Sequence, residues 1–153
     1  MSNDAARVRD AWRELCAQIE PNAVMTLGVN LELSPITFEG QARRLFNALQ
    51  RDARGRNWHT YRAATRPRAI GFIEEGVNRP HMHIAAHLPK DATLRATFAT
   101  GSSRWARIRR GGDYFFEFVD DPRAYISYIT KRFHRSLTSE HVFIYEPRER
   151  LLS

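Results

Sequence analysis

Two histidines and an acid near the middle of the chain have the types and the spacing of a metal site. His81 and His83 flank one apolar residue in a stretch that reads as a β-strand, so their side chains point to the same face. Glu74 lies seven positions before His81, across the turn-like segment 76–80. If the strand that carries Glu74 folds back beside the histidines, a carboxylate joins two imidazoles. Such a set predicts a divalent metal site with positions left open for a substrate.

A tyrosine and a lysine form a second pair of interest, on a helix expected over residues 122–135. At about 100° per residue, Tyr128 lies roughly 130° from the centre of the apolar stripe of this helix, and Tyr125 roughly 70°. Lys131 follows Tyr128 by one turn and shares its face. Because core packing does not account for Tyr128, the pair is typical of a nucleophile with a cation beside it, although such pairs also occur on solvated helices.

The charge of the chain favours a nucleic-acid partner. Lys and Arg number 24 against 17 Asp and Glu, a net charge of +7, and every cation except Lys90 and Lys131 is arginine. Arginine pairs with phosphate and stacks on bases, and interleaved aromatic residues are typical of a single-strand binder. An arginine-rich solvated surface is the alternative. The residues expected to bind DNA are Arg54, Arg56, Trp58, Arg62, Arg79, Arg104, Trp105, Arg107, Arg109, Arg110 and Arg132.

The elements that must position these residues are helices and strands in an irregular order. Helices are expected over about 4–19, 37–53, 92–98 and 122–135, with 104–110 a helix or a loop, and strands over 24–33, 69–74, 81–88, 114–119 and 141–145. This order, with hairpins and non-alternating helices, predicts an α+β fold with a largely antiparallel sheet. We expect residues 1–153 to form a single domain, since no linker or repeat divides the chain.

Cysteine usage and hydropathy predict a cytoplasmic protein without a membrane partner. Cys16 is the single cysteine and cannot form an internal disulfide, so a reducing compartment is expected. The first residues lack the basic and apolar regions of a signal peptide. No apolar run approaches the roughly 18 residues that a membrane span needs.

Taken together and in this order, the motifs resemble the HUH endonuclease superfamily, in particular the rolling-circle replication initiators (Rep proteins) of plasmids, phages and small DNA viruses. The segment His81-Met82-His83 looks like the histidine–hydrophobic–histidine motif of that family, and Tyr128-Ile129-Thr130-Lys131 looks like its tyrosine motif. The strand 24–30 is similar to the first family motif but has Gly28 where a second threonine is usual. The resemblance covers residues 22–135.

The resemblance implies a fold and a reaction. The fold is a central antiparallel sheet of about five strands flanked by helices, ferredoxin-like or RRM-like in type. The reaction is site-specific nicking of single-stranded DNA, with Mg²⁺ or Mn²⁺ held by Glu74, His81 and His83 against the scissile phosphate. Tyr128 would attack and form a 5′-phosphotyrosine, while Lys131 would contact the phosphate or the phenolate.

The same resemblance implies the setting of the protein. It would act in a bacterial cytoplasm, be encoded by a bacterium, a plasmid or a phage, and initiate rolling-circle replication at an origin-like single-stranded site, whether or not that site lies in a hairpin. The 153 residues leave no room for a helicase domain, and they contain no nucleotide-binding loop. Two expectations stay open: a separate host helicase is a partner, or the chain is the endonuclease domain of a longer Rep protein.

Three alternatives stay open at this point. Glu75 competes with Glu74 as the acidic ligand, and Tyr125 competes with Tyr128 as the nucleophile. The alternative function is a non-catalytic nucleic-acid-binding module on the same fold, in which Tyr128→Phe would keep all activity. A histidine-triad hydrolase is disfavoured, because its third alternating histidine would fall at Ala85.

Overall fold

The computed structural model describes residues 2–74, 79–121, 123–124, 127 and 142–147 of the chain. Five strands form one antiparallel sheet in the order β4-β1-β3-β2-β5. They are β1 (Ala23–Gly28), β2 (Arg68–Glu74), β3 (His81–His87), β4 (Tyr114–Phe118) and β5 (Val142–Tyr145). The helices are α1 (Ser2–Ile19), α2 (Pro35–Arg54), α3 (Ala92–Ala99) and α4 (Ser102–Ile108), with single 3₁₀ turns η1 (Trp58–Thr60) and η2 (Ala63–Thr65). The expected α+β class with an antiparallel sheet of five strands is confirmed.

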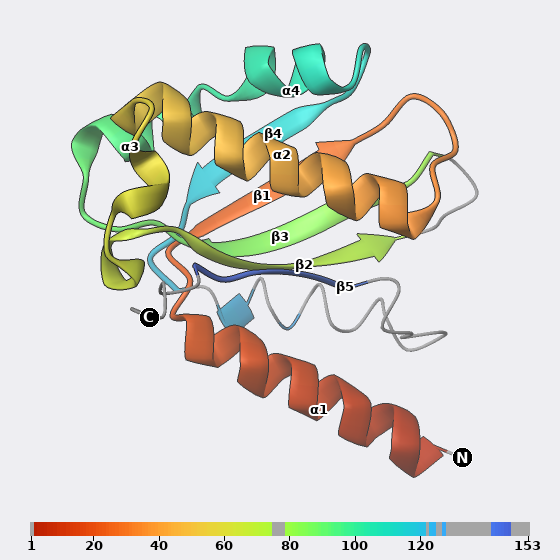
Figure 1. Cartoon of the computed structure of the whole chain (residues 1–153). Helices are drawn as coiled ribbons and strands as arrows, with labels where there is room; N and C mark the ends of the chain where they lie inside the picture. Colours follow the sequence, from red (N-terminus) through yellow and green to blue (C-terminus); the bar gives the residue numbers. More distant parts are fainter. Residues whose placement is uncertain (1, 75–78, 122, 125–126, 128–141, 148–153) are drawn as a thin grey trace, which may run out of the picture.

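Helices cover the two faces of this sheet unequally, as Figure 1 shows. Helices α2, α3 and α4 lie on one face, and α1 lies on the other. We call these the α2 face and the α1 face. Strand side chains alternate between them, so Met82 and Ile84 of β3 enter the large core under α2, whereas His81 and His83 point to the α1 face. The burial of Met82 and Ile84 under α2 therefore turns the alternating residues His81 and His83 to the α1 face.

Among the described residues, the apolar cluster on the α1 face is smaller than the cluster under α2. Cys16 and Ile19 of α1 pack on Ile70 and Phe72 of β2, and Trp12 meets the Phe72 ring edge-on at a centroid distance of 6.0 Å. Burial raises the pKa of the Cys16 thiol to about 12, so this free cysteine packs as a small apolar side chain. These contacts, together with the buried Ala85 of β3, place α1 over β2 and β3.

Helix α2 begins and ends at recognisable signals. Ser34 is the N-cap, because its side chain accepts a hydrogen bond from the Thr37 backbone N–H at 3.2 Å, and Pro35 occupies the first turn. The helix therefore starts at Pro35, two residues before the start expected from the sequence. Gly55 ends the helix with a positive φ of 84°, a conformation that favours glycine.

Strand β1 ends earlier than the sequence predicted, at Gly28 instead of Leu33. The reason is that its partner β3 begins at His81, directly opposite Gly28, so no further residue of β3 can pair with it. On its other side, Gly28 exchanges two backbone hydrogen bonds with Asp113, at 2.8 and 3.1 Å. This end of β1 is therefore fixed between His81 and Asp113.

The edge strand β5 is tied to α2 by a buried polar group. The Tyr145 hydroxyl donates to Asn47 Oδ1 at 2.6 Å and accepts from Gln50 Nε2 at 2.6 Å, and the Gln50 side chain is fully buried.

The expected helix over 122–135 lies almost wholly outside the described residues. Within the part of the chain that the structure describes, no helix has the length and apolarity to cross a membrane.

Candidate metal centre

The hairpin of β2 and β3 places the acid beside the histidine strand, at the same end of the sheet, as the sequence predicted. In the antiparallel register Glu74 is opposite His81, and Phe72 is opposite His83. Residues directly opposite one another point to the same face of a sheet. Glu74, His81 and His83 therefore share the α1 face, at the end of the sheet where β2 stops and β3 starts. Glu75, the alternative acid, lies outside the described residues.

His83 is held by polar partners on both neighbouring strands. Its Nε2 lies 2.8 Å from Glu74 Oε2, and its Nδ1 lies 3.4 Å from the Thr26 hydroxyl of β1. The side chains of His83 and Glu74 are 17% and 30% exposed, so the pair is accessible to an ion or a substrate. If Nε2 binds a metal, Nδ1–H is free to donate to Thr26, which fixes the tautomer and the ring orientation.

The Glu74–His83 pair fits a divalent ion with a preference for oxygen and nitrogen. Two ligands at adjacent corners of an octahedral Mg²⁺, with bonds of about 2.1 Å, stand about 3 Å apart. The 2.8 Å between Nε2 and Oε2 is close to that separation, and both atoms present lone pairs when Nε2 carries no proton. In the present contact the two atoms point at each other, as in a hydrogen bond, so both side chains would have to rotate for their lone pairs to meet at one ion.

The third expected ligand, His81, is not gathered with the other two. Among the residues described by the structure, no three His, Cys, Asp or Glu side chains are grouped closely enough to hold a metal ion. The His81 ring instead lies over Gly28, where a Cβ added to the glycine would meet its Cδ2 at 3.2 Å and its Nε2 at 3.3 Å. A three-ligand site thus requires His81 to turn about its side-chain torsions toward Glu74.

Three residues of this site were missed by sequence reasoning. Thr26 contacts His83, and Gly28 makes room for His81. Neighbouring strands place Glu74, His81, Gly28 and Asp113 side by side in one row across the sheet. Asp113 is the last residue of this row, at the β4 edge. A Cβ on Gly28 would also lie 3.2 Å from Asp113 Cβ. The available signal was the glycine itself, since a glycine inside a strand often marks a close approach of another group.

We predict that Gly28→Ala will raise Mn²⁺ affinity by about 2-fold or more with little effect on folding. The new methyl group would crowd the His81 ring out of its place over residue 28, and this removes the conformation that competes with the turn of His81 toward Glu74. Isothermal titration with Mn²⁺ and thermal unfolding without metal measure the two effects. The control is Gly40→Ala in α2, where a Cβ meets nothing within 4 Å and should stabilise the helix by about 0.5–1 kcal/mol. Unchanged Mn²⁺ affinity in Gly28→Ala would place His81 away from the metal.

Three of the residues expected to bind DNA serve the core instead, which is a correction. Trp105 is fully buried and donates its Nε1–H to the Gly28 carbonyl at 3.0 Å, so its ring cannot stack on a base. Trp58 is 9% exposed and lies under the Arg66 guanidinium at 5.3 Å. The Arg54 side chain is 4% exposed and is ion-paired with Asp91 at 3.2 Å.

The remaining cations fall into separate groups. Arg79 and Arg110 are exposed and lie in the segments that lead into β3 and β4 at the histidine end of the sheet. Arg109 donates to Gln41 of α2 at 3.1 Å. Arg56 and Arg62 lie near η1 and η2, which precede β2 and are roughly 20 Å from Glu74 along that strand. Arg104 and Arg107 are on α4, on the opposite face from the histidines.

The expected nucleophile and its companions cannot be placed against this site. Tyr128, Lys131, the alternative Tyr125 and the DNA-binding candidate Arg132 all lie outside the described residues.

Comparisons of the chain with protein-family models, with curated proteins and with solved structures found no match. Any inference about the chemistry of the α1 face therefore rests on the side chains found there. They are a carboxylate and an imidazole in contact, a second imidazole on the same face, and a basic chain around them.

Proposed function

We propose that this chain is a metal-dependent endonuclease of the HUH type, which nicks single-stranded DNA at a specific site and can rejoin it. The observation that carries the proposal is the contact of Glu74 with His83 at 2.8 Å, on the face shared with His81. A metal-supported phosphoryl transfer needs ligands of these kinds beside an accessible surface, and the basic charge of the chain suits a DNA substrate.

In the proposed reaction the chain supplies the ligands, the nucleophile and the cations. Glu74 and His83, joined by His81, would hold Mg²⁺ or Mn²⁺, which when bound would withdraw charge from the oxygens of the scissile phosphate. The Tyr128 hydroxyl gives up its proton and attacks phosphorus, the bond to the 3′-oxygen breaks, and that oxygen takes up a proton. The product is a 5′-phosphotyrosine and a free 3′-hydroxyl.

The supporting residues have distinct roles in this scheme. Thr26 would keep the His83 ring in place, and Lys131 would stabilise the phenolate or the phosphate. Arg79 and Arg110 are suited to the DNA backbone at the same end of the sheet. Because the phosphotyrosine keeps the phosphodiester energy, attack by a 3′-hydroxyl reseals the strand without ATP. We further propose that this reaction initiates rolling-circle replication of a plasmid or phage, with a separate helicase to open the duplex.

The test is formation of a covalent adduct. The protein is incubated with Mn²⁺ and a randomised pool of single-stranded oligonucleotides, and the products are separated on a denaturing gel. With a 3′ label the radioactivity should migrate with the protein, whereas with a 5′ label it should appear in a shorter released strand. EDTA should remove both signals. If the pool binds but never yields an adduct at any metal concentration, the non-catalytic binding module is the better description.

A further inference from the structure

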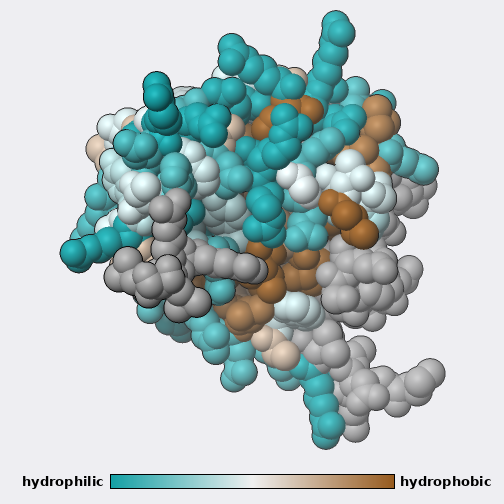
Figure 2. Space-filling model, viewed as in Figure 1, coloured by the Kyte–Doolittle hydropathy of each residue, from teal (hydrophilic) through white to brown (hydrophobic). Residues whose placement is uncertain are grey.

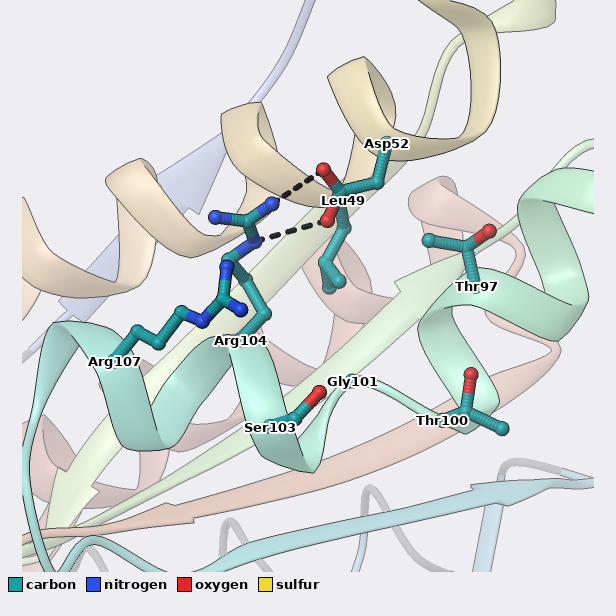
Figure 3. Close-up of a pocket in the computed structure, with 8 residues that line it drawn as sticks. All are labelled: Leu49, Asp52, Thr97, Thr100, Gly101, Ser103, Arg104 and Arg107. Atoms are coloured by element: carbon teal, nitrogen blue, oxygen red, sulfur yellow. Dashed lines mark hydrogen bonds and ion pairs between the residues drawn. The ribbon is translucent and has the colours of Figure 1, made fainter.

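The α2 face carries a groove with arginine side chains on both walls. We define the α2–α4 groove by Arg44, Asn47, Arg51, Asp52, Arg104 and Arg107. It contains two open pockets of about 360 and 230 Å³, which share Arg104 and Arg107. Figure 3 shows Arg104 and Arg107 of α4 reaching into the space beside α2, and Figure 2 shows mostly hydrophilic side chains over both helices.

The positive charge in this groove is only partly neutralised. Asp52 accepts two hydrogen bonds from the Arg104 guanidinium, one of them at 2.9 Å, and thereby fixes Arg104 across the groove. Among the described residues that line the two pockets, Asp52 is the only carboxylate. Arg44, Arg51 and Arg107 are exposed and form no ion pair with any described residue. Three cations are thus available to an anionic ligand.

The cations of the groove are arranged in a row along α2. Arg44 and Arg51 are seven residues apart on one side of α2, about 10.5 Å along the helix axis. This length corresponds to about three nucleotides at the rise of about 3.4 Å per nucleotide of one strand. Asn47 lies between the two arginines, and its Oδ1 is used by Tyr145, so its amide N–H groups remain as donors. A row of cations and amide donors suits a linear chain of phosphates.

We propose that the α2–α4 groove binds the phosphodiester backbone of a nucleic-acid segment, distinct from any segment at the Glu74–His83 pair. The sheet and its core lie between the two places, so one short stretch of DNA cannot contact both (Figure 1). Arginine forks match phosphate oxygens, and the groove offers only Ala48, Leu49 and Ile108 as apolar lining, too little to anchor a peptide. The proposal stands whether or not the chain cleaves DNA.

The test measures binding under conditions in which cleavage is impossible. Fluorescence anisotropy in EDTA follows a mixed-sequence oligonucleotide, as a single strand and as a duplex, over a range of salt concentrations. The variant Arg44→Gln/Arg107→Gln removes one cation from each wall of the groove. The matched control, Arg7→Gln/Lys90→Gln, removes two exposed cations outside the groove. Thermal unfolding checks that both proteins are folded.

We expect the groove variant to lose about 10-fold or more in affinity at about 0.1 M salt and the control to lose less than about 2-fold. In the groove variant, the slope of log K against log salt should become shallower by about 1.4 for a single strand or by about 1.8 for a duplex. If the groove variant loses affinity for the single strand, the groove binds single-stranded DNA. If it loses affinity for the duplex, the groove binds duplex DNA. Equal losses in the groove variant and the control, or no loss in either, would overturn the proposal. Because all binding is measured in EDTA, this result does not depend on the activity of the proposed nuclease.

Discussion

Replacing Tyr128 with phenylalanine will abolish the covalent protein–DNA adduct, a loss of at least about 10³-fold in the rate of its formation. The substitution removes one oxygen, and without it the chain has no atom to form the phosphodiester bond at this position. Binding of the same oligonucleotide, measured by anisotropy in EDTA, should change by less than about 2-fold, because the aromatic ring and every cation of the chain remain. The measurement is the adduct band on a denaturing gel over a time course with Mn²⁺.

Tyr125→Phe is the matched control for this prediction. It removes the same atom from the same predicted helix, three positions earlier, where no lysine follows one turn later. We expect its adduct formation to equal that of the unmodified protein. If Tyr125→Phe loses the adduct and Tyr128→Phe keeps it, the nucleophile has been assigned to the wrong tyrosine. If both variants keep the adduct, the reaction does not use this motif.

The geometry of the histidine hairpin could be predicted because two local rules agree there. Met82 and Ile84 are apolar and alternate with His81 and His83, so burying the first pair in the core under α2 must turn the second pair to the α1 face. The segment 76–80 is rich in turn residues, which places Glu74 back beside the histidines. Neither rule requires knowledge of distant parts of the chain.

The contributions of Thr26 and Asp113 could not be predicted, because they depend on long-range strand pairing. Thr26 reaches His83 only because β1 lies beside β3 in one particular register, and Asp113 reaches the row only because β4 pairs with the other side of β1. A shift of one residue in either pairing would turn these side chains to the opposite face. The sequence alone does not fix that register.

The burial of Trp105 was obscured by the charges around it. The run from Arg104 to Arg110 suggested a solvated, DNA-binding segment. In the structure α4 is amphipathic, with Trp105 stacked on Phe38 of α2 at 6.3 Å and Arg104 and Arg107 on the groove side. Helical spacing of Trp105 and Ile108 was the signal, but it is weak in a helix of seven residues.

Loss of Glu74 or His83 will reduce Mn²⁺ affinity by at least about 100-fold, since each is expected to supply a metal ligand directly. The variants Glu74→Gln and His83→Gln should be similarly impaired, and the double variant only slightly worse, because two ligands of one ion do not act independently. Thr26→Val, which removes only the partner of His83 Nδ1, should cost about 10-fold. Isothermal titration and the electron paramagnetic resonance signal of free Mn²⁺ measure these affinities.

His87→Gln is the control for the histidine variants. His87 lies on β3 and points to the same face as His81 and His83, but its Nδ1 is hydrogen-bonded to the Glu20 carbonyl at 2.8 Å. Its Mn²⁺ affinity should equal that of the unmodified chain. A large loss in Glu75→Gln with none in Glu74→Gln would transfer the acidic ligand to Glu75. If Glu74→Gln and His83→Gln both bind Mn²⁺ normally, their 2.8 Å contact is a hydrogen bond of the hairpin alone. In that case the Mn²⁺ ion detected by the titration is bound by other residues of the chain.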